Sequence, residues 1–155
     1  MMGAKSAAWG LLMTVWTFIS MVIIPLSTLK ALENGIVLQG THVRIILTTL
    51  NIGLIFLLGL IAMVLTASSY AFDNKGRAVA MFLKYLIVAY YEWVWAIGVR
   101  ELTVIMENYK IYAGIDLGIW IIIVILGSLL QGILKSFHEY AKALKKEEEE
   151  EKEEE

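Results

Sequence analysis

Apolar residues are concentrated in four long runs that are nearly free of charge. The runs cover residues 7–29, 45–72, 78–99 and 115–134. The first two contain no charged residue, the third is interrupted only by Lys84 and Glu92, and the fourth has Asp116 at its start. A helix that crosses the hydrocarbon layer of a bilayer needs about 20 mostly apolar residues. The pattern therefore predicts four transmembrane helices, and the main alternative is three spans with one interfacial segment.

The connections between these runs differ in character. Residues 73–77 are a short polar turn, so the second and third runs are expected to form a close antiparallel hairpin. Residues 30–44 contain a turn at 33–35 and a short apolar segment at 36–38, which is expected to lie in the membrane interface. Residues 100–114 are expected either to prolong the third helix or to lie amphipathically on the outer surface.

After residue 134 the sequence becomes charged. One apolar stripe with helical spacing continues there, formed by Phe137, Tyr140, Ala141 and Leu144. We therefore expect an all-α protein with a four-helix transmembrane bundle at 1–134. An amphipathic cytoplasmic helix and an acidic tail are expected to follow at 135–155. The tail is interpreted as a solvated end, and the alternatives are a docking segment for a basic partner or a weak binder of divalent cations.

The composition supports a membrane protein. Of the 155 residues, 59% are apolar and 18% are charged, and the mean hydropathy is +0.70. Soluble domains have about 45–50% apolar and about 25% charged residues. A soluble globular enzyme and a wholly disordered chain are therefore excluded.

Several kinds of chemistry are also excluded by residue type and position. The chain has no cysteine, so disulfides, thiolate catalysis and cysteine-ligated metals are not possible. Its two histidines, His42 and His138, are predicted to lie on opposite sides of the membrane and cannot share a metal. No Ser–His–acid set and no glycine-rich phosphate loop is present. We expect neither enzymatic activity nor a cofactor.

The basic residues predict the orientation. Residues 147–155 hold eight of the fifteen acids and only one of the thirteen bases. Four spans place both termini on one side, near Lys5, Lys75, Arg77, Lys135, Lys142, Lys145 and Lys146. The opposite side has only Lys30, Arg44, Arg100 and Lys110. This excess predicts a multi-pass protein of the cell membrane with both termini in the cytoplasm.

Glu92 is the strongest candidate site residue. It lies about seven residues, or roughly 10 Å, inside the outer end of the third run. An ionised carboxylate facing lipid at that depth costs several kcal/mol, so Glu92 must be neutral, paired, or facing protein or water. Lys84 is eight residues away, roughly 12 Å along the helix axis, and is expected to extend toward the cytoplasmic headgroups instead. Asn51 in the second run is the best expected hydrogen-bond donor to Glu92.

Other polar groups at similar depth are weaker candidates. They are Thr17, Ser20, Thr48, Asp116 and Trp120, together with an aromatic set that could line a cavity, namely Tyr85, Tyr90, Tyr91, Trp93 and Trp95. Gly114 and Gly118 have the four-residue spacing that lets another helix approach closely. They are therefore expected to mark a helix contact.

A local resemblance to one family is also present. The stretch Ala96-Ile97-Gly98-Val99-Arg100-Glu101-Leu102-Thr103-Val104, followed by a short outer segment and a last span, is similar to the end of the third span in the phosphate-starvation-inducible E family of small four-span proteins. The acidic features that this family would imply in the second span are missing, because residues 45–72 contain no acid. The resemblance implies no chemistry.

These observations lead to two functional hypotheses. The first is a small non-enzymatic membrane subunit, an accessory or assembly component in contact with copies of itself or a larger complex, in which Glu92 and Asn51 fix helix packing. The alternative is a small oligomeric ion channel or a proton- or cation-coupled transporter, in which Glu92 titrates or selects the ion. The expected partners are the bilayer and protein rather than nucleic acid, because the basic residues are placed to contact headgroups.

Overall fold

The computed structural model describes all residues except 1–3, 39–40, 48–49, 73, 100, 107–108, 115–117 and 155. Its helices are α1 (Ala4–Phe18), the π-helix η1 (Ile19–Ile23), α2 (Ile24–Asn34), α3 (Ile52–Ala71), α4 (Asn74–Val99) and α5 (Gly118–Glu154). Its strands are β1 (Ile36–Leu38), β2 (Thr41–Leu47), β3 (Glu101–Met106) and β4 (Tyr109–Gly114).

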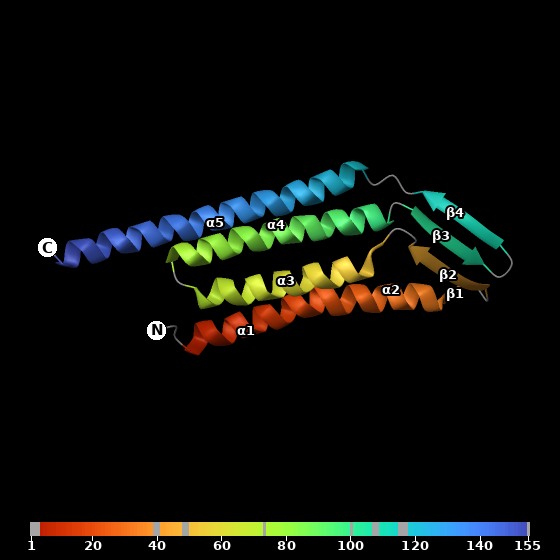
Figure 1. The fold of residues 1–155 in the computed structure, drawn as a ribbon, viewed down its shortest axis with the longest axis horizontal. Helices are drawn as coiled ribbons and strands as arrows, with labels where there is room; N and C mark the ends of the chain where they lie inside the picture. Colours follow the sequence, from red (N-terminus) through yellow and green to blue (C-terminus); the bar gives the residue numbers. More distant parts are fainter. Residues whose placement is uncertain are drawn as a thin grey trace.

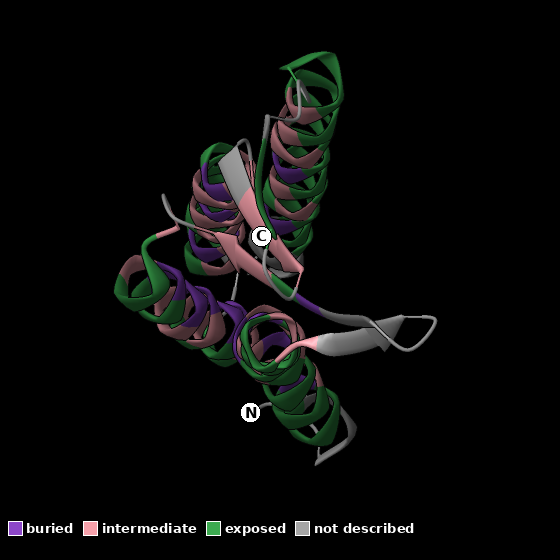
Figure 2. Cartoon of the chain, turned by 90° about the vertical axis from the view of Figure 1, so that its right-hand side faces the viewer, coloured by how far each residue is buried: buried purple, intermediate pink, exposed green. Residues whose placement is uncertain are grey.

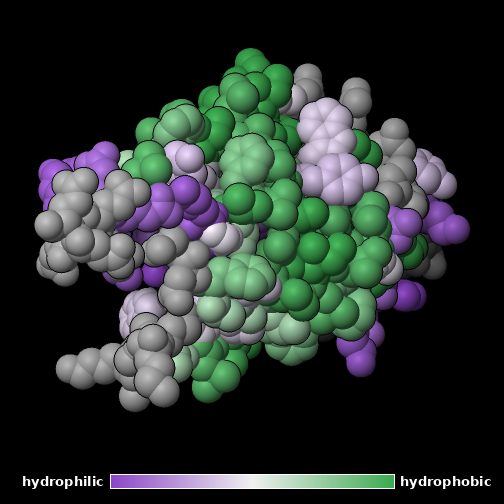
Figure 3. All heavy atoms as spheres, turned by 60° about the vertical axis from the view of Figure 1, so that its left-hand side comes forward, coloured by the Kyte–Doolittle hydropathy of each residue, from purple (hydrophilic) through white to green (hydrophobic). Residues whose placement is uncertain are grey.

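Four helical segments are long and apolar enough to cross a bilayer, as predicted. They cover Ala7–Asn34, Ile52–Ala71, Lys75–Val99 and Gly118–Glu149. Figure 3 shows the result on the molecular surface, where a broad hydrophobic band separates hydrophilic residues at the two ends of the molecule. The expected close hairpin is also present, since α3 ends at Ala71 and α4 begins at Asn74.

The helices lie side by side in a row, in the order α1, α3, α4, α5 (Figure 1). Along the direction of the helix axes, the strands lie at one end of the bundle, which we call the sheet end. α1 begins and α5 ends at the other, the terminal end. Seen along the helices, the row is curved, and the buried residues follow the contacts between neighbours (Figure 2). Among the described residues, α5 packs extensively only on α4, and α3 is the most buried of the helices.

The all-α prediction was incomplete, because both outer connections form strands. The strands make one antiparallel sheet in the order β1-β2-β3-β4. β2 and β3 pair from Val43 with Met106 to Leu47 with Leu102. Segment 36–38 is strand β1, and its expected position in the membrane interface stays a prediction. The described residues between 101 and 114 form β3 and β4 and do not prolong the third helix. The sheet joins the connection after α2 to the connection after α4.

The second apolar run is divided between two elements. Ile45, Ile46 and Leu47 belong to β2, and β-branched residues favour strands. Helix α3 begins only at Ile52, where the side chain of Asn51 accepts a hydrogen bond from the N–H of Leu54 at 3.0 Å. This N-cap satisfies a backbone donor that the first turn of a helix cannot pair itself. The span is therefore shorter than predicted.

The first span is one continuous helical rod that ends at a glycine. α2 stops at Asn34, and Gly35 follows with φ of 90°, a conformation that glycine adopts without strain. Arg44 on β2 donates from Nε to the carbonyl oxygen of Glu33 at 2.8 Å. This contact fixes the sheet to the last turn of α2.

The contact between α1 and α3 is tight and locally satisfied. Gly59 lets η1 approach, because a Cβ there would lie 2.6 Å from Val22 Cγ2. The hydroxyl oxygens of Thr17 and Thr66 lie 3.3 Å apart, and each hydroxyl also lies 2.8 Å from the carbonyl oxygen four residues earlier on its own helix. Thr66 is fully buried.

The last helix continues without a break from the apolar run into the acidic tail, as expected. The predicted apolar stripe is largely exposed, however: Phe137 is 70% exposed, and Tyr140 and Leu144 are also exposed. Ala143 is buried instead, at 3% exposure. At the terminal end, Lys75 pairs with Glu147 at 3.0 Å, so the first acid of the tail has a partner within the chain.

A candidate intramembrane site along α4 and α5

The contact between α4 and α5, which we call the α4–α5 seam, is organised by a glycine. A Cβ at Gly132 on α5 would overlap the side chain of Tyr85 on α4. The absent side chain lets the two helices approach closely. In contrast, nothing lies within 4 Å of the corresponding position at Gly127. Gly132 therefore faces α4, whereas Gly127 faces away from the chain.

Glu92 lies on this seam, near the middle of the helices' apolar part. Its Oε1 accepts a hydrogen bond from Ser128 Oγ on α5 at 2.9 Å. Its Oε2 is buried and has no hydrogen-bond partner among the described residues. A buried carboxylate normally has both oxygens satisfied, because an unpaired polar atom in an apolar medium is costly. One of the two carboxylate oxygens of Glu92 is therefore without a partner among the described residues.

A cavity lies beside Glu92 on the same seam. It has a volume of about 340 Å³ and an almost entirely apolar wall. The wall is formed by residues of α4 and α5, namely Tyr91, Glu92, Trp95, Ala96, Val99, Trp120, Ile121, Val124 and Ile125. Glu92 is the only charged residue among them. Of the aromatic residues expected to line a cavity near Glu92, Tyr91 and Trp95 do so, whereas Tyr85, Tyr90 and Trp93 are not part of its wall. Trp120 lines the cavity as well, although it was not in that set.

The first span contributes to this region through a backbone carbonyl. Pro25 has no N–H, so it cannot donate to the carbonyl four residues earlier, that of Met21. The hydroxyl of Tyr91 donates to Met21 O at 2.8 Å instead. The ring of Tyr91 packs at a tilt against that of Trp95, with the centroids 6.5 Å apart. The π-helix and the proline thus hold Tyr91 at the cavity wall, and they connect it to α1.

Polar residues continue from Glu92 toward the terminal end. On α5 they recur every three or four residues, at Ser128, Gln131, Lys135, His138 and Lys142. This spacing places them on one face of the helix. The same face lines the Glu92 cavity through Ile121 and Val124. At the other end it lines a second, polar cavity of about 410 Å³ through Lys142 and Lys145. A polar stripe therefore connects the two cavities.

Two lysines meet on this stripe beside Tyr85. Lys135 Nζ donates to the Tyr85 hydroxyl at 2.7 Å and lies 5.3 Å from the centre of its ring. Lys84 Nζ lies 5.8 Å from the same centre. Lys84 Nζ thus lies near the ring of its neighbour in sequence, Tyr85. Its expected extension toward the headgroups stays a prediction. No carboxylate pairs with either lysine within the described part of the chain.

The remaining predicted site residues lie elsewhere. Asn51 caps α3 and is not brought to Glu92, since each has a different partner. Gly114 is the last residue of β4 and Gly118 the first of α5, so they do not share a helix face. Thr48 and Asp116 are outside the described residues. Lys84 and Glu92 both lie on the α4–α5 seam, but the described residues show no hydrogen bond or ion pair between them.

Three contributors to the site were not predicted, namely Ser128, Gly132 and the carbonyl of Met21. Ser128 and Gly132 lie four residues apart in the fourth run, and that spacing is a recognisable signal for a polar helix contact. That the Met21 carbonyl receives no hydrogen bond from residue 25 could have been inferred from Pro25. Among the described residues, no group of three or more histidine and acidic side chains could hold a metal ion.

Comparisons with family models, with curated proteins and with solved structures give no significant match to this chain. The local resemblance at residues 96–104 is therefore not accompanied by a family match.

Proposed function

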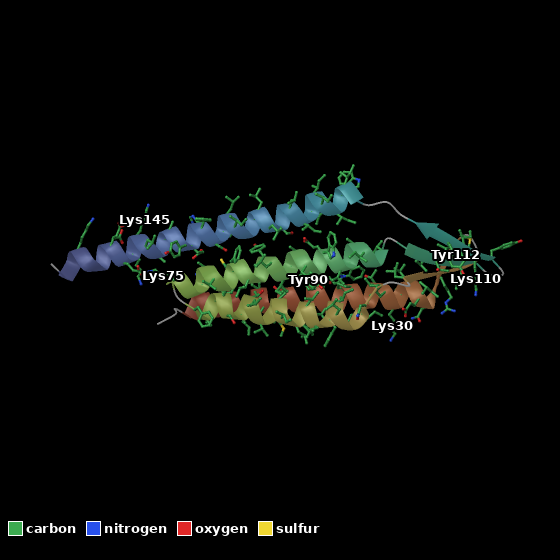
Figure 4. The ribbon with its side chains drawn as sticks, turned by 45° about the horizontal axis from the view of Figure 1, so that its top comes forward. Lys30, Lys75, Tyr90, Lys110, Tyr112 and Lys145 are labelled. Carbon is green, nitrogen blue, oxygen red and sulfur yellow. The ribbon has the colours of Figure 1, made fainter. Side chains whose placement is uncertain are left out.

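We propose that the protein is a multi-pass protein of the cell membrane with both termini in the cytoplasm. The four apolar helices and the hydrophobic band support the membrane location. Figure 4 illustrates the distribution of basic residues, with Lys75 and Lys145 near the terminal end and Lys30 and Lys110 near the sheet end. Bases are more numerous toward the terminal end, which favours a cytoplasmic position for it.

Within the membrane, we propose that the protein moves protons, as a small channel or a proton-coupled transporter, with Glu92 as the titrating group. The half-satisfied carboxylate of Glu92 at the wall of the cavity carries this proposal. Ionisable residues inside a membrane span are costly and typically mark ion or proton pathways. The polar stripe supplies groups through which a proton could pass between Glu92 and the terminal end.

Protons are favoured over metal cations because of the lysines on the stripe. A sodium or potassium ion travelling from the terminal end to Glu92 would pass Lys84 and Lys135. Both ammonium groups lie near the ring of Tyr85, and neither has a carboxylate partner among the described residues. Like charges in a poorly solvated region repel strongly. Protons, in contrast, are passed between hydroxyl, imidazole and carboxyl groups.

The proposal is tested by proton flux in sealed liposomes that contain the purified protein and a pH-sensitive dye. Glu92→Gln keeps the shape and the acceptor for Ser128 but removes the titrating group, so flux should fall to that of empty liposomes. Glu33→Gln, at the exposed end of α2, is the matched control and should leave flux unchanged. Full flux from a correctly inserted Glu92→Gln protein would refute the role of Glu92.

A second candidate function is that of an accessory or assembly subunit. It is favoured by the exposed side of α5 that borders the polar stripe. There Gly127 has open space around it, and Gln131, at the edge of the stripe, is exposed without a hydrogen-bond partner among the described residues. Small and polar residues together promote helix association in membranes. The partner we expect is a second copy or another membrane protein, and the two functions are compatible.

The absence of cysteine makes this second candidate easy to test. Single cysteines at positions 127 and 131 should form disulfide-linked dimers in native membranes, whereas cysteines at positions 126 and 130, on a different face of α5, should not. Equal crosslinking at all four positions would indicate random collision. No crosslinking and a monomeric mass in mild detergent would argue against self-assembly through this face.

A further inference from the structure

Lys84 and Lys135 on the α4–α5 seam have no carboxylate partner among the described residues, and their position indicates a second site. We propose that Lys84, Lys135 and the Tyr85 hydroxyl bind a phosphate group, which belongs either to an anionic lipid headgroup or to a soluble phosphate compound. This site is separate from Glu92 and does not depend on proton movement. Its geometry consists of two ammonium groups gathered at one tyrosine ring.

The position of the lysines supports an anionic ligand. Lys84 is seven residues beyond Arg77 on α4, which corresponds to about 10 Å along the helix axis. Arg77 lies near the terminal end, where its Nε is 3.5 Å from Glu139 and its guanidinium lies over the ring of Tyr70. Arg77 therefore has an acidic partner, whereas the two deeper lysines have none among the described residues. Lys84 is partly buried and Lys135 is exposed, and two ammonium groups near one ring repel each other unless an anion lies between them.

A basic entrance leads to these lysines. The polar cavity of about 410 Å³ lies between the start of α4 and the last turns of α5. Its charged lining consists of four bases and two acids, namely Arg77, Lys142, Lys145, Lys146, Glu139 and Glu149. The lining therefore carries an excess of two positive charges. Arg77 and Lys84 on α4, and Lys142 and Lys135 on α5, are each seven residues apart, so each pair lies on one face of its helix.

The entrance and the lysines thus form a basic groove on the side of the membrane where anionic lipids are exposed to the cytoplasm. Basic pockets between transmembrane helices on this side are suited to phosphate headgroups. The tyrosine hydroxyl adds a neutral group that can donate to or accept from a phosphate oxygen. The carboxylates of Glu139 and Glu149 repel an anion at the entrance. We therefore expect the phosphate of the ligand to bind at Lys84 and Lys135.

The test measures lipid retention by native mass spectrometry of the delipidated full-length protein. Phosphatidylglycerol and phosphatidylcholine with identical acyl chains are added in equal amounts. The wild-type protein should retain phosphatidylglycerol in preference by about tenfold. The double variant Lys84→Gln with Lys135→Gln should lose this preference. The matched control, Lys30→Gln with Lys110→Gln at the sheet end, removes the same charge and should keep it.

A second arm separates the two sources of phosphate. Inorganic pyrophosphate, compared with chloride at constant ionic strength, should raise the thermal midpoint of the wild-type protein if a soluble compound is the ligand. A shift without lipid preference assigns the site to a soluble phosphate, and lipid preference without a shift assigns it to a headgroup. If the Gln variants misfold, Lys84→Arg with Lys135→Arg should retain binding. The absence of both signals in the wild-type protein, or equal loss in the control, would overturn the proposal.

Discussion

The first and the last helix–helix contacts of the row, α1 with α3 and α4 with α5, use polar residues in opposite ways. Between α1 and α3, Thr17 and Thr66 lie deep in the contact, but each hydroxyl is within hydrogen-bonding distance of a carbonyl of its own helix. Along the α4–α5 seam and among the described residues, Glu92 Oε2 has no hydrogen-bond partner and Lys84 has no carboxylate partner. Satisfied groups stabilise a contact, whereas unsatisfied groups retain capacity for a ligand or a proton. This difference is the reason that we propose a function for the α4–α5 seam and not for the α1–α3 contact.

The largest expected effect breaks the α1–α3 contact. Gly59→Leu should lower the free energy of unfolding by about 1–3 kcal/mol, because the new side chain meets Val22 and the Met21 backbone in a closely packed region. Gly127→Leu is the matched control, since nothing lies within 4 Å of that position. Denaturation in mixed micelles measures both variants. Equal stability of the two would contradict the tight contact.

A smaller effect separates the two contacts by function. Ser128→Ala removes the hydrogen bond to Glu92 and should change proton flux by up to about tenfold, the kinetic equivalent of one hydrogen bond. Thr66→Val removes a buried hydroxyl of the α1–α3 contact and should leave flux unchanged. The liposome assay described above compares the two variants directly. A larger flux change in Thr66→Val would reverse the assignment of function.

The bond between α4 and η1 offers a third test. Tyr91→Phe should reduce stability by about 1 kcal/mol, because Met21 O then has neither the tyrosine hydroxyl nor a backbone donor from residue 25. Tyr90→Phe is the control, since Tyr90 is half exposed and lies on a different face of α4 from the buried Tyr91. Thermal unfolding of both proteins in one detergent would give the comparison, and an equal loss in the two would argue against the Met21 contact.

The smallest effect is expected at the terminal end. Lys75→Gln removes the ion pair with Glu147, but both side chains are strongly exposed, so the thermal midpoint should not change measurably. The change in salt dependence should be equally small. A clear loss of stability would mean that the acidic tail is fixed to α4 more firmly than one exposed pair allows.

The spans were predictable because a bilayer demands long apolar helices. The sheet was not, because residues 45–47 are the start of the second apolar run and a short apolar segment can be helix or strand. The partner of that segment lies far along the chain, at residues 102–104. Local sequence carries no record of such a pairing.

The error in the start of α3 also explains why the partner of Glu92 was not found. A span beginning at residue 45 would place Asn51 well inside the membrane, at the depth of Glu92. Because α3 begins at Ile52, Asn51 is a capping residue at the helix end. The position of Glu92 on the third apolar helix was predictable from its own run. Its neighbour depended on how α4 and α5 pack, where Gly132 allows a close approach to Tyr85.

The π-helix at residues 19–23 has a consequence for the chain beyond it. A single extra residue wound into a helix rotates everything downstream by roughly 100° about the axis. Deleting one residue there would turn the carbonyl of Glu33 away from Arg44, and the first helical segment would lose this contact with the sheet while keeping its hydrophobicity. The π-helix therefore sets the rotation of α2 about its axis, and with it the orientation of α2 toward the sheet.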